Sequence, residues 1–94
     1  MILVWRARAI AQMRNIYAHI ARYTDPAHAY EVLAEIHQQI NGLVDNPQMG
    51  RRGHQRGTYQ RVIKVGLQTY RCTYRISGQT IYIGSVRDTR QQGA

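Results

Sequence analysis

The spacing of apolar residues changes along this chain, from steps of three and four in its first half to steps of two in its second half. Steps of three and four place side chains on one face of a helix, whereas steps of two place them on one face of a strand. The change therefore predicts two helices followed by an antiparallel sheet, which is an α+β fold.

The first half contains two amphipathic helices separated by a short break. We predict the first helix over Ala7–Tyr23. Thr24-Asp25-Pro26 interrupts it, and Asp25 can cap a second helix whose first position Pro26 fills. Asn46-Pro47 ends that second helix. The apolar positions are Ile10, Met13, Ile16, Tyr17 and Ile20 in the first helix, and Ala29, Leu33, Ile36, Ile40 and Leu43, flanked by Val32 and Val44, in the second. Helices joined by so short a turn form an antiparallel hairpin.

Strands are predicted on both sides of the helical hairpin. The apolar run Ile2–Trp5 predicts a short strand before the first helix. Three strands follow a Gly- and Arg-rich loop over residues 48–58, at Arg61–Val65, Thr69–Ile76 and Thr80–Val86. A turn at Ser77-Gly78-Gln79 joins the last two. The order is β-α-α-β-β-β, with the first strand beside one of the later three and the hairpin covering the apolar face of the sheet.

The length and the ends of the chain limit its class. Ninety-four residues fit one domain, spanning residues 1–94, and not two. The single cysteine, Cys72, excludes an internal disulfide framework. The apolar start of the chain is too short for a signal peptide, and no stretch approaches the length of a membrane span. We expect a cytoplasmic protein that does not associate with a membrane.

The positive charge is concentrated in the second half. The chain has a formal net charge of +8, yet basic and acidic residues cancel over residues 1–50. Residues 51–94 carry nine basic residues against Asp88 alone, and all but one of the basic residues in the chain are arginine. The planar guanidinium suits carboxylates and phosphates. The implied partner is acidic, either a nucleic acid or an acidic protein segment.

Alternation in the Thr69–Ile76 strand predicts where this charge lies. Tyr70 and Cys72 share one face with Tyr74 and Ile76, while Arg71 and Arg75 share the other. The apolar face should pack on the helices, so the arginines point outward and Lys64 can join them from the neighbouring strand. The residues that we expect to bind a partner are Arg61, Lys64, Arg71, Arg75, Arg87 and Arg90. This basic face could bind an acidic protein segment or a nucleic acid, or could be a solvated surface without a specific role.

Several segments resemble the ParE-type toxins of the ParE/RelE superfamily. Met49-Gly50-Arg51-Arg52-Gly53 and then Gly57-Thr58-Tyr59-Gln60-Arg61-Val62-Ile63 are similar to Met-Gly-Arg-Pro-Gly, a short gap, and Gly-Thr-Arg-Glu-Leu-Val. Tyr70-Arg71-Cys72-Thr73-Tyr74-Arg75-Ile76 resembles the central strand of that superfamily, and Ile81-Tyr82-Ile83 with Val86 and Arg90 resembles its closing strand. The resemblance spans nearly the whole chain and implies a RelE/ParE-like fold.

The resemblance also implies a function. Characterised ParE toxins act on DNA gyrase and are not nucleases, and a cognate antitoxin neutralises toxins of this superfamily by wrapping a C-terminal segment around them. The chain would then be a toxin that inhibits a target by binding, with no catalytic residue and no cofactor, and with a cognate antitoxin, whose C-terminal segment is acidic, as its partner. This chain departs from the ParE pattern at Arg52, where Pro is usual, at Arg61, where an apolar residue is usual, and at Asp88, where His is usual.

Two alternatives stay open: an inactive or purely regulatory relative, given the changes at Arg52, Arg61 and Asp88, and a ribosome-dependent mRNA endoribonuclease of the RelE type. Lys64, Arg71 and Asp88 would form its catalytic set. A nuclease needs a group that takes the hydroxyl proton and another that stabilises the phosphorane charge. Asp88 stands between Arg87 and Arg90, and an ion-paired carboxylate is a poor base. The last-strand Arg of RelE toxins falls on Thr89, and the tail Gln91-Gln92-Gly93-Ala94 offers no acid or base. The sequence therefore favours the ParE reading.

No metal site or reactive nucleophile is indicated. His19, His28 and His37 lie on the predicted helices and His54 in the loop, without a metal-ligand partner at suitable spacing. Cys72 lies on the inward face of a strand, where a buried inert thiol is expected.

Overall fold

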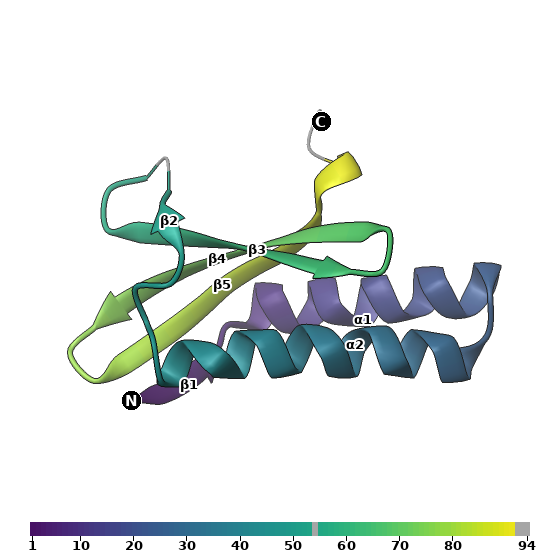
Figure 1. Cartoon of the computed structure of the whole chain (residues 1–94), viewed down its shortest axis with the longest axis horizontal. Helices are drawn as coiled ribbons and strands as arrows, with labels where there is room; N and C mark the ends of the chain where they lie inside the picture. The colour runs from purple at the N-terminus through teal and green to yellow at the C-terminus, as the bar shows by residue number, and fades with distance from the viewer. Residues whose placement is uncertain (54, 92–94) are drawn as a thin grey trace.

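The computed structural model describes residues 1–53 and 55–91. Two helices pack against one face of a twisted sheet (Figure 1). The elements in chain order are β1 (Ile2–Trp5), α1 (Ala7–Tyr23), α2 (Pro26–Asn41), a 3₁₀ turn (Gly42–Val44), β2 (Arg51–Arg52), β3 (Thr58–Val65), β4 (Gln68–Ser77), β5 (Thr80–Asp88) and a second 3₁₀ turn (Thr89–Gln91). The predicted α+β order of strand, helical hairpin and three longer strands is confirmed.

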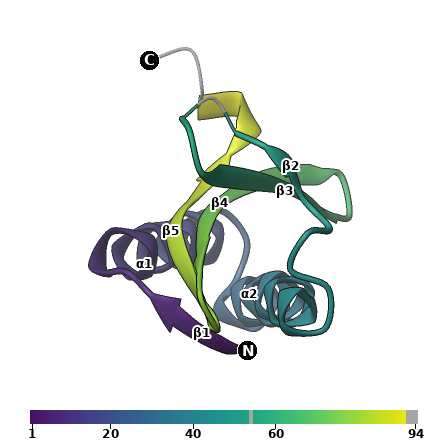
Figure 2. The ribbon, with the colours of Figure 1, turned by 90° about the vertical axis from the view of Figure 1, so that its left-hand side faces the viewer.

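The sheet has five strands in the order β1-β5-β4-β3-β2. β1 pairs in parallel with β5, and all the other neighbours pair antiparallel. Viewed along the helix axes, β1 lies at one end of the sheet, and β3 and β2 lie at the other (Figure 2). The first strand therefore joins the sheet beside one of the later strands, as predicted.

The helices form where the apolar spacing predicts them. The Asp25 carboxylate accepts a hydrogen bond of 2.8 Å from the His28 backbone N–H, and Pro26 fills the first position of α2. The predicted end of α2 at Asn46-Pro47 is wrong, because the helix ends at Asn41 and tightens into the 3₁₀ turn that follows. None of the helices in the described ranges is long and apolar enough to cross a membrane.

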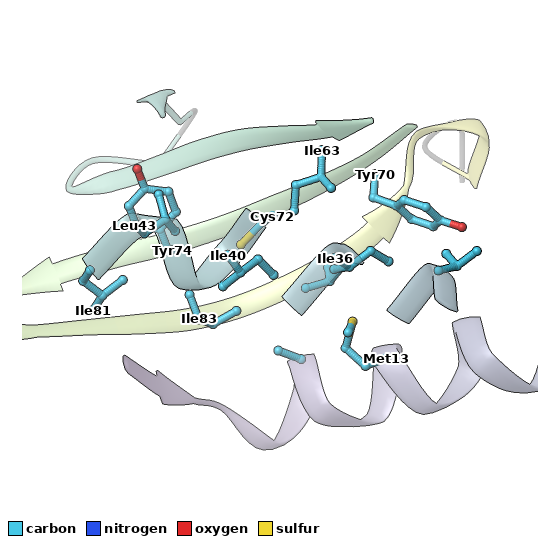
Figure 3. Close-up of a cluster of buried hydrophobic side chains, with 13 residues drawn as sticks. Met13, Ile36, Ile40, Leu43, Ile63, Tyr70, Cys72, Tyr74, Ile81 and Ile83 are labelled. Atoms are coloured by element: carbon cyan, nitrogen blue, oxygen red, sulfur yellow. The ribbon is translucent and has the colours of Figure 1, made fainter. Parts of the chain in front are cut away.

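The core lies between the sheet and the hairpin (Figure 3). Its fully buried side chains include Ile36 and Ile40 from α2 and Cys72, Tyr74 and Ile83 from the sheet. Burying a large apolar side chain stabilises by about 1.5–3 kcal/mol, so this layer holds the helices on the strands.

Tyr74 connects the core to the segment before β2. Its hydroxyl donates to the Pro47 carbonyl at 2.7 Å and accepts from the Gly50 N–H at 3.1 Å. A Cβ at Gly50 would lie 2.6 Å from both the Tyr74 hydroxyl and the Gln60 carbonyl, so only glycine fits this approach. The residues predicted as a loop over 48–58 thus contain the short strand β2, which pairs with Tyr59 and Gln60 of β3.

A bulge in β5 decides which side chains of its second half face the helices. Tyr74 pairs with Ile83 but Thr73 pairs with Ser85, so Gly84 is the extra residue. Beyond Gly84 the alternation shifts by one, and Val86 turns into the core. The Val86 N–H donates to the Gln12 side chain of α1 at 2.8 Å.

Candidate binding site

The face of the sheet turned away from the helices carries a row of basic side chains. In an antiparallel pair, residues directly opposite each other point to the same face. Arg71 lies opposite Val62 on one side and Arg87 on the other, and Arg75 lies opposite Thr58 and Tyr82. Lys64, opposite Thr69, belongs to the same face. The predicted outward orientation of Arg71, Arg75 and Lys64 is therefore confirmed.

Arg71 and Arg87 occupy directly opposed positions on neighbouring strands. Like charges in this arrangement destabilise a sheet. The one ion pair in the part of the chain that the structure describes joins Arg90 to Asp88, so neither Arg71 nor Arg87 has an acidic partner there. An anion lying between the two guanidinium groups would remove this repulsion.

A concave basin of about 380 Å³ adjoins this pair. Its basic lining residues are Arg6, Arg8, Arg75 and Arg87. Hydroxyl and amide side chains from Thr58, Gln60, Thr73 and Ser85 complete much of the wall. None of the five acidic residues of the chain lines the basin.

Two basin residues, Arg6 and Arg8, come from the first half of the chain, whose charges cancel. The Arg6 N–H donates to the Ile83 carbonyl at 3.0 Å, which continues the pairing of β1 with β5. The Arg6 guanidinium lies 4.5 Å from the centre of the Tyr82 ring, an attractive cation–π arrangement. Counting charge over each half of the chain gave no sign that these two arginines belong to the basic site. The position of Arg6 directly after a strand that joins the sheet is the signal that could have indicated it.

The remaining predicted binding residues lie elsewhere. Arg61 is opposite Cys72, so it faces the helices and not the basic face, and its buried Nε has no hydrogen-bond partner among the residues that the structure describes. Arg90 lies beyond β5, where its guanidinium contacts the Asp88 carboxylate at 3.1 Å. Arg87 lines the basin, whereas Arg90 does not. A role for Arg61 or Arg90 in binding a partner stays a prediction.

Asp88 is separated from the two basic residues that were grouped with it as a catalytic set. It lies opposite Tyr70, a core residue, and so belongs to the helix side of the sheet, whereas Lys64 and Arg71 lie on the other side. Burial tends to raise the pKa of the Asp88 carboxyl, but hydrogen bonds and charge from Arg90 outweigh it and hold the pKa below its usual value. A carboxylate in this state does not readily accept a proton.

The other titratable candidates form no reactive centre in the described residues. Burial raises the pKa of the Cys72 thiol to about 12, against a lowering effect of Arg61, so the thiol stays protonated and inert. No cluster of three or more His, Cys, Asp or Glu residues able to hold a metal occurs within residues 1–53 and 55–91. His54, like the tail Gln92-Gly93-Ala94, lies outside the described residues.

Comparison with known proteins identifies the family. The sequence model of the ParE toxin of the type II toxin–antitoxin system parDE matches residues 3–93. This chain belongs to the ParE toxin family. No curated protein matches it.

Two solved structures are similar to this ParE-family chain. A chain from the chromosomal ParDE toxin–antitoxin system of P. aeruginosa superimposes with a TM-score of 0.79 at 26% sequence identity, covering 94% of this chain and 95% of that one. A chain of the intact E. coli RelBE toxin–antitoxin complex superimposes with a TM-score of 0.65 at 16% identity, covering 92% of this chain and 93% of that one. The predicted ParE/RelE-like fold is confirmed over almost the full length of the ParE-family chain.

Proposed function

We propose that this ParE-family chain inhibits DNA gyrase in the cytoplasm by binding to it, and that a cognate antitoxin neutralises the chain. In this proposal, an acidic C-terminal segment of the antitoxin docks on the basic face of the sheet, along Arg71 and Arg87 and into the basin. The similarity to a chain of a ParDE toxin–antitoxin system supports an antitoxin partner.

The opposed pair Arg71–Arg87 is the observation that carries this proposal. The pair lies beside further arginines and no acidic residue lines the basin, so the isolated chain keeps an unneutralised cluster of positive charge. Carboxylates of an acidic segment would form charge-assisted hydrogen bonds there, and the guanidinium fork can bind each carboxylate through two parallel bonds. The same charge would speed encounter with an acidic partner.

Binding rather than RNA cleavage is favoured by the position of Asp88. General-base catalysis requires the base to reach the proton that it removes, within hydrogen-bond distance or through one water. Asp88 lies on the helix side of the sheet and is paired with Arg90, away from Lys64 and Arg71. The basic face therefore offers groups that hold an anion, and its described residues include no carboxylate to accept a proton.

The deciding experiment measures gyrase supercoiling with the purified chain, beside a ribosome-programmed mRNA cleavage assay. We expect supercoiling to be inhibited and the mRNA to stay intact. Asp88→Asn should leave inhibition unchanged, whereas an RNA-cleaving toxin using Asp88 as base would lose activity by orders of magnitude. Cleaved mRNA with unaffected gyrase would overturn the proposal.

The proposed binding of an antitoxin is tested separately, by measuring the affinity of the chain for the protein encoded by the adjacent reading frame. Arg71→Gln and Arg87→Gln should each weaken binding by about tenfold or more, since a charged hydrogen bond contributes about 1.5–3 kcal/mol. Arg22→Gln is the matched control, because Arg22 is an exposed arginine on α1 outside the basin. Equal losses in all three variants would indicate that only net charge matters, and that this face is not the docking site.

A further inference from the structure

A second cavity lies at the end of the helical hairpin, and the proposed function does not use it. It has a volume of about 470 Å³ and opens where the α1–α2 turn, the β3–β4 turn and the end of β5 meet. The two turns lie at the same end of the molecule, away from β1 (Figure 1). Ile20 and Val32 of the helices and Val65 of β3 form its apolar walls. We call this cavity the tip pocket.

The tip pocket collects negative charge in a chain whose net charge is +8. Glu31 and Asp88 both line it, whereas none of the five acidic residues of the chain lines the basin. The Arg90 guanidinium lies 3.1 Å from the Asp88 carboxylate and compensates that charge. Glu31 has no basic partner within residues 1–53 and 55–91, so it supplies the uncompensated charge of the pocket. The balance favours a cation over an anion as the occupant.

Tyr70 offers a buried hydroxyl to the same cavity. Tyr70 is 2% exposed and lines the tip pocket from β4. Burial raises the pKa of its hydroxyl, the charge of Asp88 adds to the rise, and the charge of Arg90 opposes it. No hydrogen bond from the described residues contributes, and Figure 3 shows the hydroxyl turned away from Cys72. A buried polar group without a partner is unfavourable, and a phenolic oxygen can accept a hydrogen bond from a ligand.

Aromatic rings complete the lining of the tip pocket. His19 and Tyr23 of α1 pack against each other with their ring centres 4.8 Å apart, and His28 of α2 lines the pocket as well. The face of a tyrosine ring attracts cations, so Tyr23 adds to the attraction by the carboxylates. An aliphatic stem, like that of lysine, can lie against apolar surface while its charged end meets polar groups. The lining thus matches both parts of such a cation.

We propose that the tip pocket binds an organic cation, an ammonium or guanidinium group carried on an aliphatic stem. The charged group donates hydrogen bonds to the Glu31 carboxylate and to the Tyr70 hydroxyl oxygen, and the stem lies against Val32 and Val65. A free polyamine and a lysine or arginine side chain of another protein present this same chemistry. The tip pocket and the basin share no lining residue, so cation binding is independent of the proposed gyrase inhibition and antitoxin binding.

Three probes with the same butyl stem test the charge requirement: butylammonium, butanol and butyrate. Each is titrated into the full isotope-labelled chain at low salt, where exposed charges are screened least, and binding is followed by NMR. Butylammonium should shift the backbone amide signals of Gly66, Leu67 and Gln68, which line the pocket, until they saturate. The signal of Ser85, in the basin, should stay in place. Butanol should bind several-fold more weakly, and butyrate should not shift the pocket signals.

Matched variants locate the binding. Glu31→Gln keeps the shape of an exposed side chain and removes its charge, so butylammonium should bind about two- to fivefold more weakly. Asp45→Asn is the control, because Asp45 is an exposed carboxylate outside the pocket. Tyr70→Phe removes the hydroxyl oxygen and should weaken binding by about tenfold or more. This variant should unfold at the urea concentration of the parent or above, because the hydroxyl has no partner to lose among the described residues.

Four results would overturn the proposal. Equal binding of the three probes would mean that only the stem is recognised, and tighter binding of butyrate would mean that Arg90 holds an anion there. Equal losses in Glu31→Gln and Asp45→Asn would mean that only net charge matters. Butylammonium that causes no saturable shift at the pocket would remove the site altogether. If butylammonium binds as expected, spermidine and a capped lysine tripeptide distinguish the sources, because the tighter of the two indicates a free polyamine or a protein side chain.

Discussion

Neutralising Arg71 should make the isolated chain more stable while weakening its binding to an acidic partner. Arg71 faces Arg87 across β4 and β5, and neither has an acidic neighbour in the described residues. Two unit charges 4 Å apart interact by about 1 kcal/mol under water-like screening, and by less at larger separations. That value agrees with the range of about 0.2–1 kcal/mol measured for cross-strand pairs. We expect Arg71→Gln to raise the unfolding free energy by about half a kcal/mol, or the melting temperature by about 2–4 °C for a domain of this size.

The assay is urea unfolding at low salt and again in about 1 M NaCl, where the screening length falls to about 3 Å. The gain in Arg71→Gln should disappear at high salt because it comes from relieved repulsion. Arg71→Lys is the matched control, since it keeps the charge and should give no gain. In a double-mutant cycle with Arg87→Gln, the second substitution should add nothing to the first.

Several outcomes would refute this reasoning. A loss of stability in Arg71→Gln would mean that the side chain packs or bonds in a way that outweighs the repulsion. A gain that persists at high salt would assign the effect to strand propensity and not to charge. Fully additive gains from Arg71→Gln and Arg87→Gln would show that the two guanidinium groups do not interact, and the argument for an anion between them would fail.

Three further predictions concern stability. Burial is the chief reason why the pKa of the Cys72 thiol rises to about 12 from 9.0 in the folded chain. The contribution of this shift to the unfolding free energy is complete below pH 9 and is lost as pH rises toward 12, with a slope of at most about 1.4 kcal/mol per pH unit. In urea unfolding at alkaline pH, Cys72→Ala should lack this part of the slope, and an identical slope would contradict the prediction. Tyr74→Phe leaves the Pro47 carbonyl and the Gly50 N–H without their partner. We therefore expect the free energy of unfolding, measured in urea, to fall by about 1–3 kcal/mol. A change near zero would mean that water replaces the hydroxyl. Asp25→Ala removes the cap of α2 and should lower the unfolding free energy by about 0.5–2 kcal/mol. The proposed inhibition of gyrase should be unchanged in a supercoiling assay at a temperature where the variant is folded.

The helices could be predicted from the sequence because their signals are local. Apolar residues at steps of three and four, a break at Thr24, and the Asp25-Pro26 start give the bounds of α1 and the start of α2 as the structure has them. The pattern could not say which apolar positions face the sheet. Ile10 and Tyr17 belong to the same periodic stripe as Met13, yet in the folded chain they are 40% and 36% exposed while Met13 is buried.

Strand β2 could not be predicted because its cause is not local. Two arginines carry no alternation, and they pair with β3 because Tyr74, more than twenty residues later, holds the preceding segment through Pro47 and Gly50. The set of basic residues predicted from the sequence was incomplete for the same reason. Arg6 reaches the basin only because β1 joins the sheet beside β5, at the far end of the chain.

The sequence by itself determined the order of the elements, the ends of α1 and the inward and outward faces of β4, since periodicity and capping act over a few residues. The faces of β5 were decided by tertiary structure. Strict alternation from Ile81 and Ile83 would turn Arg87 toward the helices and Asp88 outward, but the bulge at Gly84 reverses both. A bulge moves every later residue of the strand to the opposite face of the sheet. As a result, Val86 packs in the core against α1. That shift is the physical reason why Arg87 meets Arg71 on the basic face while Asp88 pairs with Arg90 on the other side.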